Sequence, residues 1–167
     1  MATDSLRSPN IWLVSANENG SVYQYHWHEF YKKPTQKTQR ENWCGDQGVK
    51  SNTSNARIQE MRINDIIVSY QVGEGIVGFA RLASEGYRYR DKYWTFDLKP
   101  APIVRFSNAL PFSNMRQLPN ARQDIEFVKI LRGTVFRITQ RGFENITSAL
   151  LYLNPKQQDK VQVFLGL

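Results

Sequence analysis

The side chains that could perform chemistry lie in the first third of the chain. Cys44, the only cysteine, stands in the stretch WCGDQGVKSN, and a cysteine becomes an effective nucleophile only beside a base. The histidines His26 and His28 of HWHE could supply that base, or could bind a metal together with Glu29. Histidines two residues apart share a face on a strand but diverge on a helix, and no further ligand follows at a recognisable spacing. These residues favour a folded loop and an amphipathic segment over a catalytic or metal site.

Motifs for phosphate binding and nuclease chemistry are incomplete. The stretch GDQG lacks the GxxxxGK[ST] arrangement, and no dinucleotide fingerprint follows a strand. Asp124, Glu126 and Lys129 partly match an acid–acid–lysine nuclease set, but their spacing differs and the segment can be a solvated helix. A hydrolase or nuclease that uses Cys44 or the histidines is therefore the weaker hypothesis.

The chain is basic, with a formal net charge of +7 and a pI near 9.6. Lysine and arginine displace counterions from phosphates, so this bias suits a polyanionic partner. Aromatic residues make up 13% of the sequence, which fits base stacking and equally fits an aromatic core. The basic residues cluster in three regions, as a solvated surface or as a phosphate-binding rim: Lys32, Lys33, Lys37, Arg40 and Lys50; Arg81, Arg88, Arg90 and Lys92; Arg132, Arg137 and Arg141.

The length of 167 residues predicts one folded domain, at ~100–200 residues per domain. No run approaches the ~18 apolar residues of a membrane span, and no signal peptide is recognisable at the start. A single cysteine cannot form an internal disulfide, so we expect a reduced, cytoplasmic protein. We expect a disordered lead over residues 1–10, the domain over 11–155 and a C-terminal tail over 156–167.

Strands and short helices intermingle along the domain. Apolar runs predict strands at IWLVSA, DIIVSYQ, GIVGFARLAS and GTVFRIT, and alternation predicts a half-buried strand at YWTFDLKP with Thr95 on its solvated face. The prolines of PAPIVRF place the next strand at an edge. Helices are predicted within SVYQYHWHEFYKK, SNTSNARIQEMR, PFSNMRQL and FENITSALLYLN, while QDIEFVKIL fits a helix or a strand. Because no βαβ rhythm occurs, we expect an α+β fold, a small mixed barrel with short helices around it.

The order of these pieces resembles the EVE domain, a PUA-like fold related to the YTH readers of methylated adenine. The matching pieces are IWLVSAN, the Trp–Gly loop WCGDQGVKSN, INDIIVSYQ with GIVGFARLAS, YWTFDLKPAPIVRF and LRGTVFRITQRGFENITSAL. The resemblance spans Ile11 to Leu153 and implies a PUA-like β-barrel or pseudobarrel. Asn64 stands where the family has glycine before the central strand, and asparagine also tolerates a positive φ. The loop reads VKSN in place of valine–arginine–asparagine.

The resemblance implies a reader, not an enzyme, with no cofactor. Such domains resemble base-flipping modules that hold one modified nucleobase in an aromatic-walled pocket. Flipping costs a few kcal/mol, and ring stacking returns about 1–3 kcal/mol per base. The partner expected first is DNA with a modified cytosine, and the alternative is methylated adenine or modified RNA. A membrane partner is not expected, and the sequence leaves open an effector domain or partner protein.

The resemblance also implies roles for particular residues. Trp43 is expected to be a stacking wall, with Trp94 as the other wall or beneath it. Trp12 is expected in the core, and Trp27 either in the core or in an exposed lid. Contacts to the base are expected from Val14, Ser15, Ala16, Ser51, Asn52, Tyr70 and Gln71. Contacts to phosphates are expected from Lys50, Arg57, Arg81, Arg88, Arg90 and Arg132.

Overall fold

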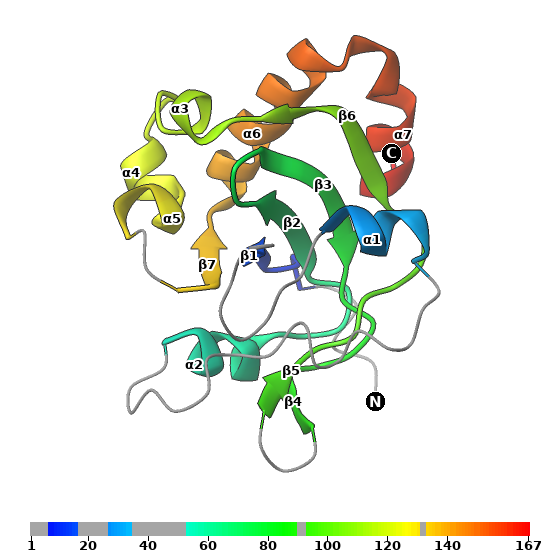
Figure 1. Ribbon diagram of the computed structural model, residues 1–167, viewed down its shortest axis with the longest axis vertical. Coiled ribbons are helices and arrows are strands. Elements are labelled where there is room, and N and C mark those ends of the chain that lie inside the picture. The colour runs from blue at the N-terminus through cyan, green and yellow to red at the C-terminus, as the bar shows by residue number, and fades with distance from the viewer. Residues whose placement is uncertain (1–6, 17–26, 35–52, 90–92, 131–132) are drawn as a thin grey trace.

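A mixed five-stranded sheet, ordered β6–β3–β2–β1–β7, forms the centre of the fold (Figure 1). The computed structural model describes residues 7–16, 27–34, 53–89, 93–130 and 133–167. β1 and β2 run parallel and the other neighbouring strands run antiparallel. The strands of the sheet are β1 (Ile11–Ala16), β2 (Ile66–Gln71), β3 (Gly75–Arg81), β6 (Val104–Leu110) and β7 (Val135–Ile138).

The α+β class with short helices around a mixed sheet is confirmed, and the described strands form an open five-stranded sheet, not a closed barrel. β6 and β7 are its two edges, so the strand of PAPIVRF lies at an edge as its prolines predict. Asn154 and Gln157 donate and accept hydrogen bonds along the backbone of β6 through their side-chain amides. These amides occupy backbone groups of an edge strand that would otherwise lack protein partners.

A two-stranded ribbon of β4 (Tyr87–Tyr89) and β5 (Tyr93–Thr95) stands apart from the sheet. The predicted strand YWTFDLKP was expected to continue past Thr95 with this residue facing solvent, and that prediction is wrong. Thr95 and Phe96 are 0% and 1% exposed. Thr95 is the last residue of β5, and the next bridge in this segment joins Leu98 to Leu82.

Short helices surround the sheet. QDIEFVKIL, which fitted a helix or a strand, forms two one-turn helices separated by extended Ile125, which bridges to Ile138 of β7. Thr139 caps the longest helix by accepting a hydrogen bond from the Gly142 N–H at 3.1 Å. The helices are α1 (Trp27–Lys32), α2 (Thr53–Glu60), α3 (Phe112–Met115), α4 (Ala121–Asp124), α5 (Glu126–Lys129), α6 (Gln140–Leu153) and α7 (Gln158–Leu165).

The expected tail after residue 155 contains α7, which packs on the sheet. Its side chains Val161 and Phe164 are buried, and the Phe164 ring lies 5.7 Å from the Phe79 ring of β3. Figure 1 shows α6 and α7 above the sheet, with α2 and the β4–β5 ribbon below it. The C-terminal segment therefore belongs to the same core as the sheet.

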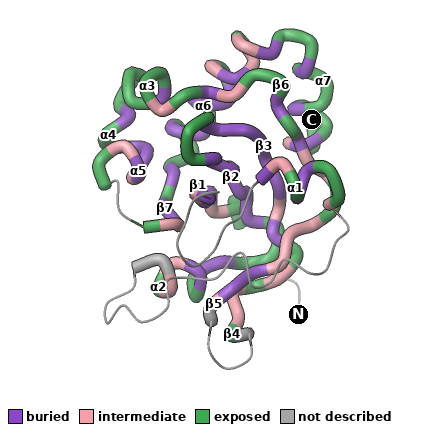
Figure 2. The backbone as a smooth tube through the Cα atoms, in the orientation of Figure 1, coloured by how far each residue is buried: buried purple, intermediate pink, exposed green. Residues whose placement is uncertain are grey.

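Strand alternation separates two apolar cores, and the central strands are buried (Figure 2). On one face, residues such as Leu13 and Val68 pack with α3 to α7. On the other face, Trp12 packs with residues of α1, α2 and β3. Trp12 and Trp27 are 2% and 0% exposed, so Trp12 lies in the core as predicted, and Trp27 also takes the core position.

Asp65 fixes the start of β1 against the start of β2. Its buried carboxylate accepts hydrogen bonds from Asn10 N at 2.9 Å, Trp12 Nε1 at 3.0 Å and Arg62 N at 3.0 Å. Asn64 has φ +71°, so this asparagine supports a left-handed turn, as expected. The turn and the carboxylate together set the register of the two parallel strands.

Candidate functional site

The parallel strands β1 and β2 end beside each other at Ala16 and Gln71. Three backbone groups at this end have partners inside the protein. The Val14 carbonyl accepts from Trp27 Nε1 at 3.1 Å, Ser15 N donates to the Thr134 carbonyl at 2.8 Å, and the Ala16 carbonyl accepts from Val72 N at 2.9 Å. The predicted base contacts of residues 14–16 would therefore use the other backbone and side-chain groups of these residues, or would share the Val14 and Ala16 carbonyls with their present donors.

Gln71 carries the most informative polar group at this end. Its side chain is 1% exposed, and its Oε1 accepts a hydrogen bond from Trp27 N at 2.8 Å. This bond fixes the orientation of the amide, because the backbone N–H requires an acceptor. The Nε2 is buried and has no hydrogen-bond partner among the described residues. A buried donor without a partner costs about 1–3 kcal/mol, which a ligand acceptor at this position would recover.

The sheet divides the predicted base contacts between its two faces. Val14, Ala16 and Gln71 face the core that contains α1 and α2, whereas Tyr70 faces the opposite core. The Tyr70 ring lies 4.7 Å from the Phe127 ring, and burial raises the pKa of its phenol. Ser15 is paired with Tyr70 and shares its face because strand residues alternate. Only a ligand beyond the strand ends can reach residues of both sets.

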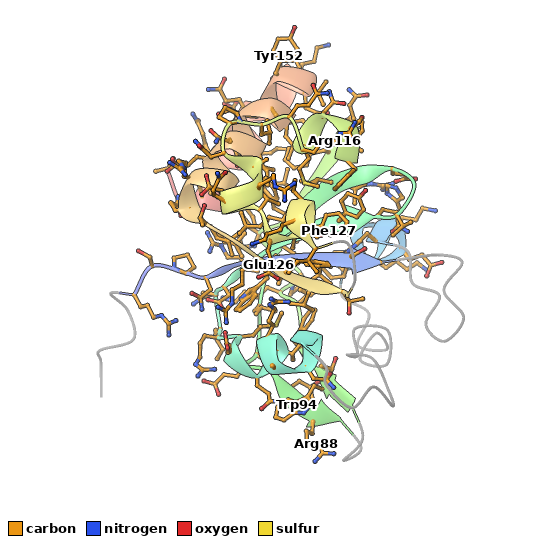
Figure 3. All side chains as sticks on the ribbon, turned by 90° about the vertical axis from the view of Figure 1, so that its left-hand side faces the viewer. Arg88, Trp94, Arg116, Glu126, Phe127 and Tyr152 are labelled. Carbon is orange, nitrogen blue, oxygen red and sulfur yellow. The ribbon has the colours of Figure 1, made fainter. Side chains whose placement is uncertain are left out.

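Trp94 lies on β5, at the far side of the core that also holds Trp27. It is partly exposed and is paired with exposed Arg88 across the ribbon (Figure 3). An aromatic ring and a cation therefore stand side by side at the end of the molecule below α2. This arrangement suits stacking on a base next to a phosphate contact.

Two predicted phosphate ligands have partners inside the fold. Arg57 forms an ion pair with Glu126 and donates to the Val135 carbonyl at 3.0 Å, which ties α2 to β7 and α5. Arg81 donates to the Asn64 and Phe164 carbonyls at 3.0 Å, and its guanidinium lies 4.8 Å from the centre of the Phe164 ring. Burial lowers the pKa of Arg81. Both arginines thus have structural roles whether or not they also bind phosphate.

The remaining predicted contacts lie outside the described residues: Trp43, Lys50, Ser51, Asn52, Arg90 and Arg132. Cys44 and His26 also lie there. His28 is described, with its Nε2 at 2.5 Å from a Glu74 carboxylate oxygen and its Nδ1 at 3.3 Å from Arg105. Within the described ranges, no group of three or more histidine, cysteine or acidic side chains could hold a metal ion.

The partial nuclease set has its carboxylates in ion pairs. Asp124 accepts from Arg141 at 2.6 and 3.2 Å, and this hydrogen bonding lowers the pKa of the Asp124 carboxyl. Glu126 is held by Arg57. Two carboxylates that are each bound by an arginine resemble structural ion pairs more than an acid–base pair.

The Gln71–Trp27 contact was missed by sequence reasoning. Trp27 N reaches a side chain 44 positions further along the chain, and the sequence left Trp27 either in the core or in an exposed lid. No helix in the described part of the chain is long and apolar enough to cross a membrane.

Comparison with known proteins finds one matching family and several solved structures with a similar fold. The model of the family described as EVE domain matches residues 10–149. A hypothetical protein from Leishmania major has a TM-score of 0.63 at 15% identity, covering 90% of this chain and 98% of that one. Human THYN1, solved in complex with DNA containing 5-methylcytosine, has a TM-score of 0.63 at 15% identity, covering 84% of this chain and 97% of that one.

A protein from Rhodopseudomonas palustris is also similar, with a TM-score of 0.57 at 19% identity, covering 82% of this chain and 90% of that one. Such identities show a common fold. No curated protein matches the sequence.

Proposed function

This chain belongs to the EVE domain family, and from that premise we propose that it reads modified nucleobases in nucleic acid. The proposed ligand is a flipped modified base, with modified cytosine in DNA as the first candidate. The match over residues 10–149 carries the proposal. The structural likeness to THYN1, which was solved with 5-methylcytosine-containing DNA, supports this choice of base.

The physical properties of the chain support a nucleic-acid ligand. A net charge of +7 favours association with a polyanion. Trp94 offers a partly exposed ring, and Trp43 is the second proposed wall. Stacking on such rings returns about 1–3 kcal/mol per base, which offsets the few kcal/mol needed to flip it.

Gln71 is the proposed contact to the base edge. Its buried Nε2 is a donor without a partner among the described residues, and O2 and N3 of cytosine are acceptors on the Watson–Crick edge. A site built to donate a hydrogen bond rejects a base that offers another donor there, because both donors would remain unsatisfied. Gln71 would thus select the type of base, while the fit around the added group would select the modification.

Trp43→Ala tests the pocket. Competition binding would compare a DNA oligonucleotide containing 5-methylcytosine, its unmodified counterpart, and RNA containing methylated adenine. We expect the wild type to prefer the first, and the variant to lose this preference while circular dichroism shows an intact fold. If the preference persists in Trp43→Ala, the pocket assignment is wrong. A wild-type preference for the modified RNA would instead replace DNA as the proposed target.

A further inference from the structure

Two clefts flank the β7 edge of the sheet and meet at Arg137 and Ile138. The first cleft lies between β7, the segment before β1 and the end of α2, and is lined by Arg7 and Arg62. The second lies between β7 and the helices α4 and α5, and is lined by Arg122 and Lys129. Figure 3 looks onto this side of the molecule, with Glu126 near its centre.

We propose that Arg7, Arg62, Arg122, Lys129 and Arg137 form a phosphodiester-binding band along the β7 edge, separate from the base-contacting end of β1. We refer to these five residues as the β7 band. None of them is among the phosphate contacts that the family resemblance implies. The inference rests on the proposed function in one respect, because it assigns the band to the same nucleic acid.

Positive charge in the two clefts is only partly compensated. Three carboxylates also line them, and each is held by an arginine: Glu60 by Arg137, Asp124 by Arg141, and Glu126 by Arg57. The arginines that hold Asp124 and Glu126 do not line either cleft, so these two ion pairs neutralise no cation of the β7 band.

Most cations of the band remain available to an external anion. Arg122 and Lys129 are exposed and have no ion pair or hydrogen bond with any described side chain. Within the described ranges, the Arg7 side chain makes only a 3.5 Å hydrogen bond with Asn10. The Arg62 guanidinium donates to the carbonyls of Gln59 and Met61, and its Nε lies 4.0 Å from a carboxylate oxygen of exposed Glu85. Solvent-exposed pairs at this distance contribute little, so Arg62 also retains most of its charge for a ligand.

The pairing of β7 with β1 places the band and the proposed base-contacting end on neighbouring strands. β7 runs antiparallel to β1, with Val135 opposite Val14 and Ile138 opposite Ile11. Arg137 lies opposite Trp12, so the band lies beside the start of β1, about 20 Å of strand away from the end proposed to contact the base. The charges of one DNA strand recur every ~3.4 Å along the duplex axis, so a duplex aligned with β1 presents several phosphates over this distance. One nucleic acid can therefore contact both surfaces.

The double variant Arg122→Gln/Lys129→Gln tests the band on the full chain. A matched control, Lys156→Gln/Lys160→Gln, removes the same charge from exposed lysines of the C-terminal segment that line neither cleft. Binding of a DNA duplex containing 5-methylcytosine and of its unmodified counterpart would be measured over a range of NaCl concentrations. We expect the band variant to lower the slope of log K against log[salt] by about 2, one unit per lost phosphate contact, and to weaken both duplexes equally. The control should leave the slope near the wild-type value.

Three results would overturn the band: an unchanged slope in the band variant, an equal loss in the control, or a loss confined to the modified duplex. If the salt slope is unchanged and the band variant loses binding to vesicles containing phosphatidylserine, the ligand of the band is a lipid headgroup and not DNA. The second would mean that total charge, not position, governs binding. Failure of the proposed function has a different signature, since a wild type without preference for the modified duplex can still show the slope change.

Discussion

Gln71→Met tests whether the side-chain amide of Gln71 binds the base or only supports the fold. The substitution removes the acceptor of Trp27 N and also removes the buried Nε2 that lacks a partner. Each unsatisfied buried group costs about 1–3 kcal/mol, so losing one penalty and gaining another nearly cancel. We expect the free energy of unfolding to stay within about 1 kcal/mol of wild type. Affinity for the modified base should fall about 3–10-fold, because one net hydrogen bond of about 0.5–1.5 kcal/mol is lost.

Gln157→Met is the matched control. Gln157 is also a buried glutamine, but its Oε1 accepts from Ser107 N at 2.9 Å and its Nε2 donates to the Arg105 carbonyl at 2.8 Å. Its replacement removes two hydrogen bonds to backbone groups of β6, and at about 0.5–1.5 kcal/mol each we expect a loss of about 1–3 kcal/mol. Base affinity should not change.

Urea denaturation measures the stabilities, and competition binding with modified and unmodified oligonucleotides measures the affinities. An equal m value for all three proteins would show that the unfolding transitions are comparable. The reasoning is refuted if Gln71→Met is as destabilised as Gln157→Met and binds the modified base like the wild type. In that case the Gln71 amide would be purely structural.

Two further predictions concern the helices packed around the sheet. The pKa of Asp124 is lowered by its hydrogen bonds to Arg141, so its stabilising effect is complete above the ordinary carboxyl pKa and is lost as pH falls through the depressed value. Asp124→Asn should therefore show less acid destabilisation than wild type in urea melts below about pH 4; an identical pH profile would contradict this linkage. Phe164→Ala should cost about 3–5 kcal/mol, because a ring 1% exposed and packed on Phe79 leaves a cavity. A loss below about 1 kcal/mol in the same melts would mean that α7 contributes little to the core.

The main strands could be predicted because buried strands are continuous apolar runs. β1, β2 and β3 are buried along almost their whole lengths, so their sequences contain few polar residues. The burial of Thr95 could not be predicted, because alternation in YWTFDLKP fits a half-buried strand and only tertiary packing covers this side chain. The α7 helix did have a signal, since Val161 and Phe164 stand at helical spacing in the expected tail.

The functional contacts were less predictable than the strands. Arg57 and Arg81 were expected to bind phosphate because of their charge, but charge alone does not reveal partners such as Glu126 or the Phe164 carbonyl. Arg7 and Arg122 belong to distant parts of the sequence and meet along one edge only because β7 pairs with β1. A long-range strand pairing of this kind is not encoded in local patterns.

The proposed base contact and the β7 band would supply different parts of the binding energy. Modified and unmodified duplexes carry the same phosphates, so the band would strengthen both equally and would make both affinities fall with salt. Gln71 and the aromatic walls would contact the base itself, where a methyl-sized fit discriminates by roughly 1–3 kcal/mol. The ratio of the affinities for the modified and unmodified duplexes should then be nearly independent of salt, since binding of either duplex releases the same counterions. Because β1 begins beside the band and ends beside Gln71, one strand of the sheet would set the spacing between the edge that holds the backbone and the group that selects the base.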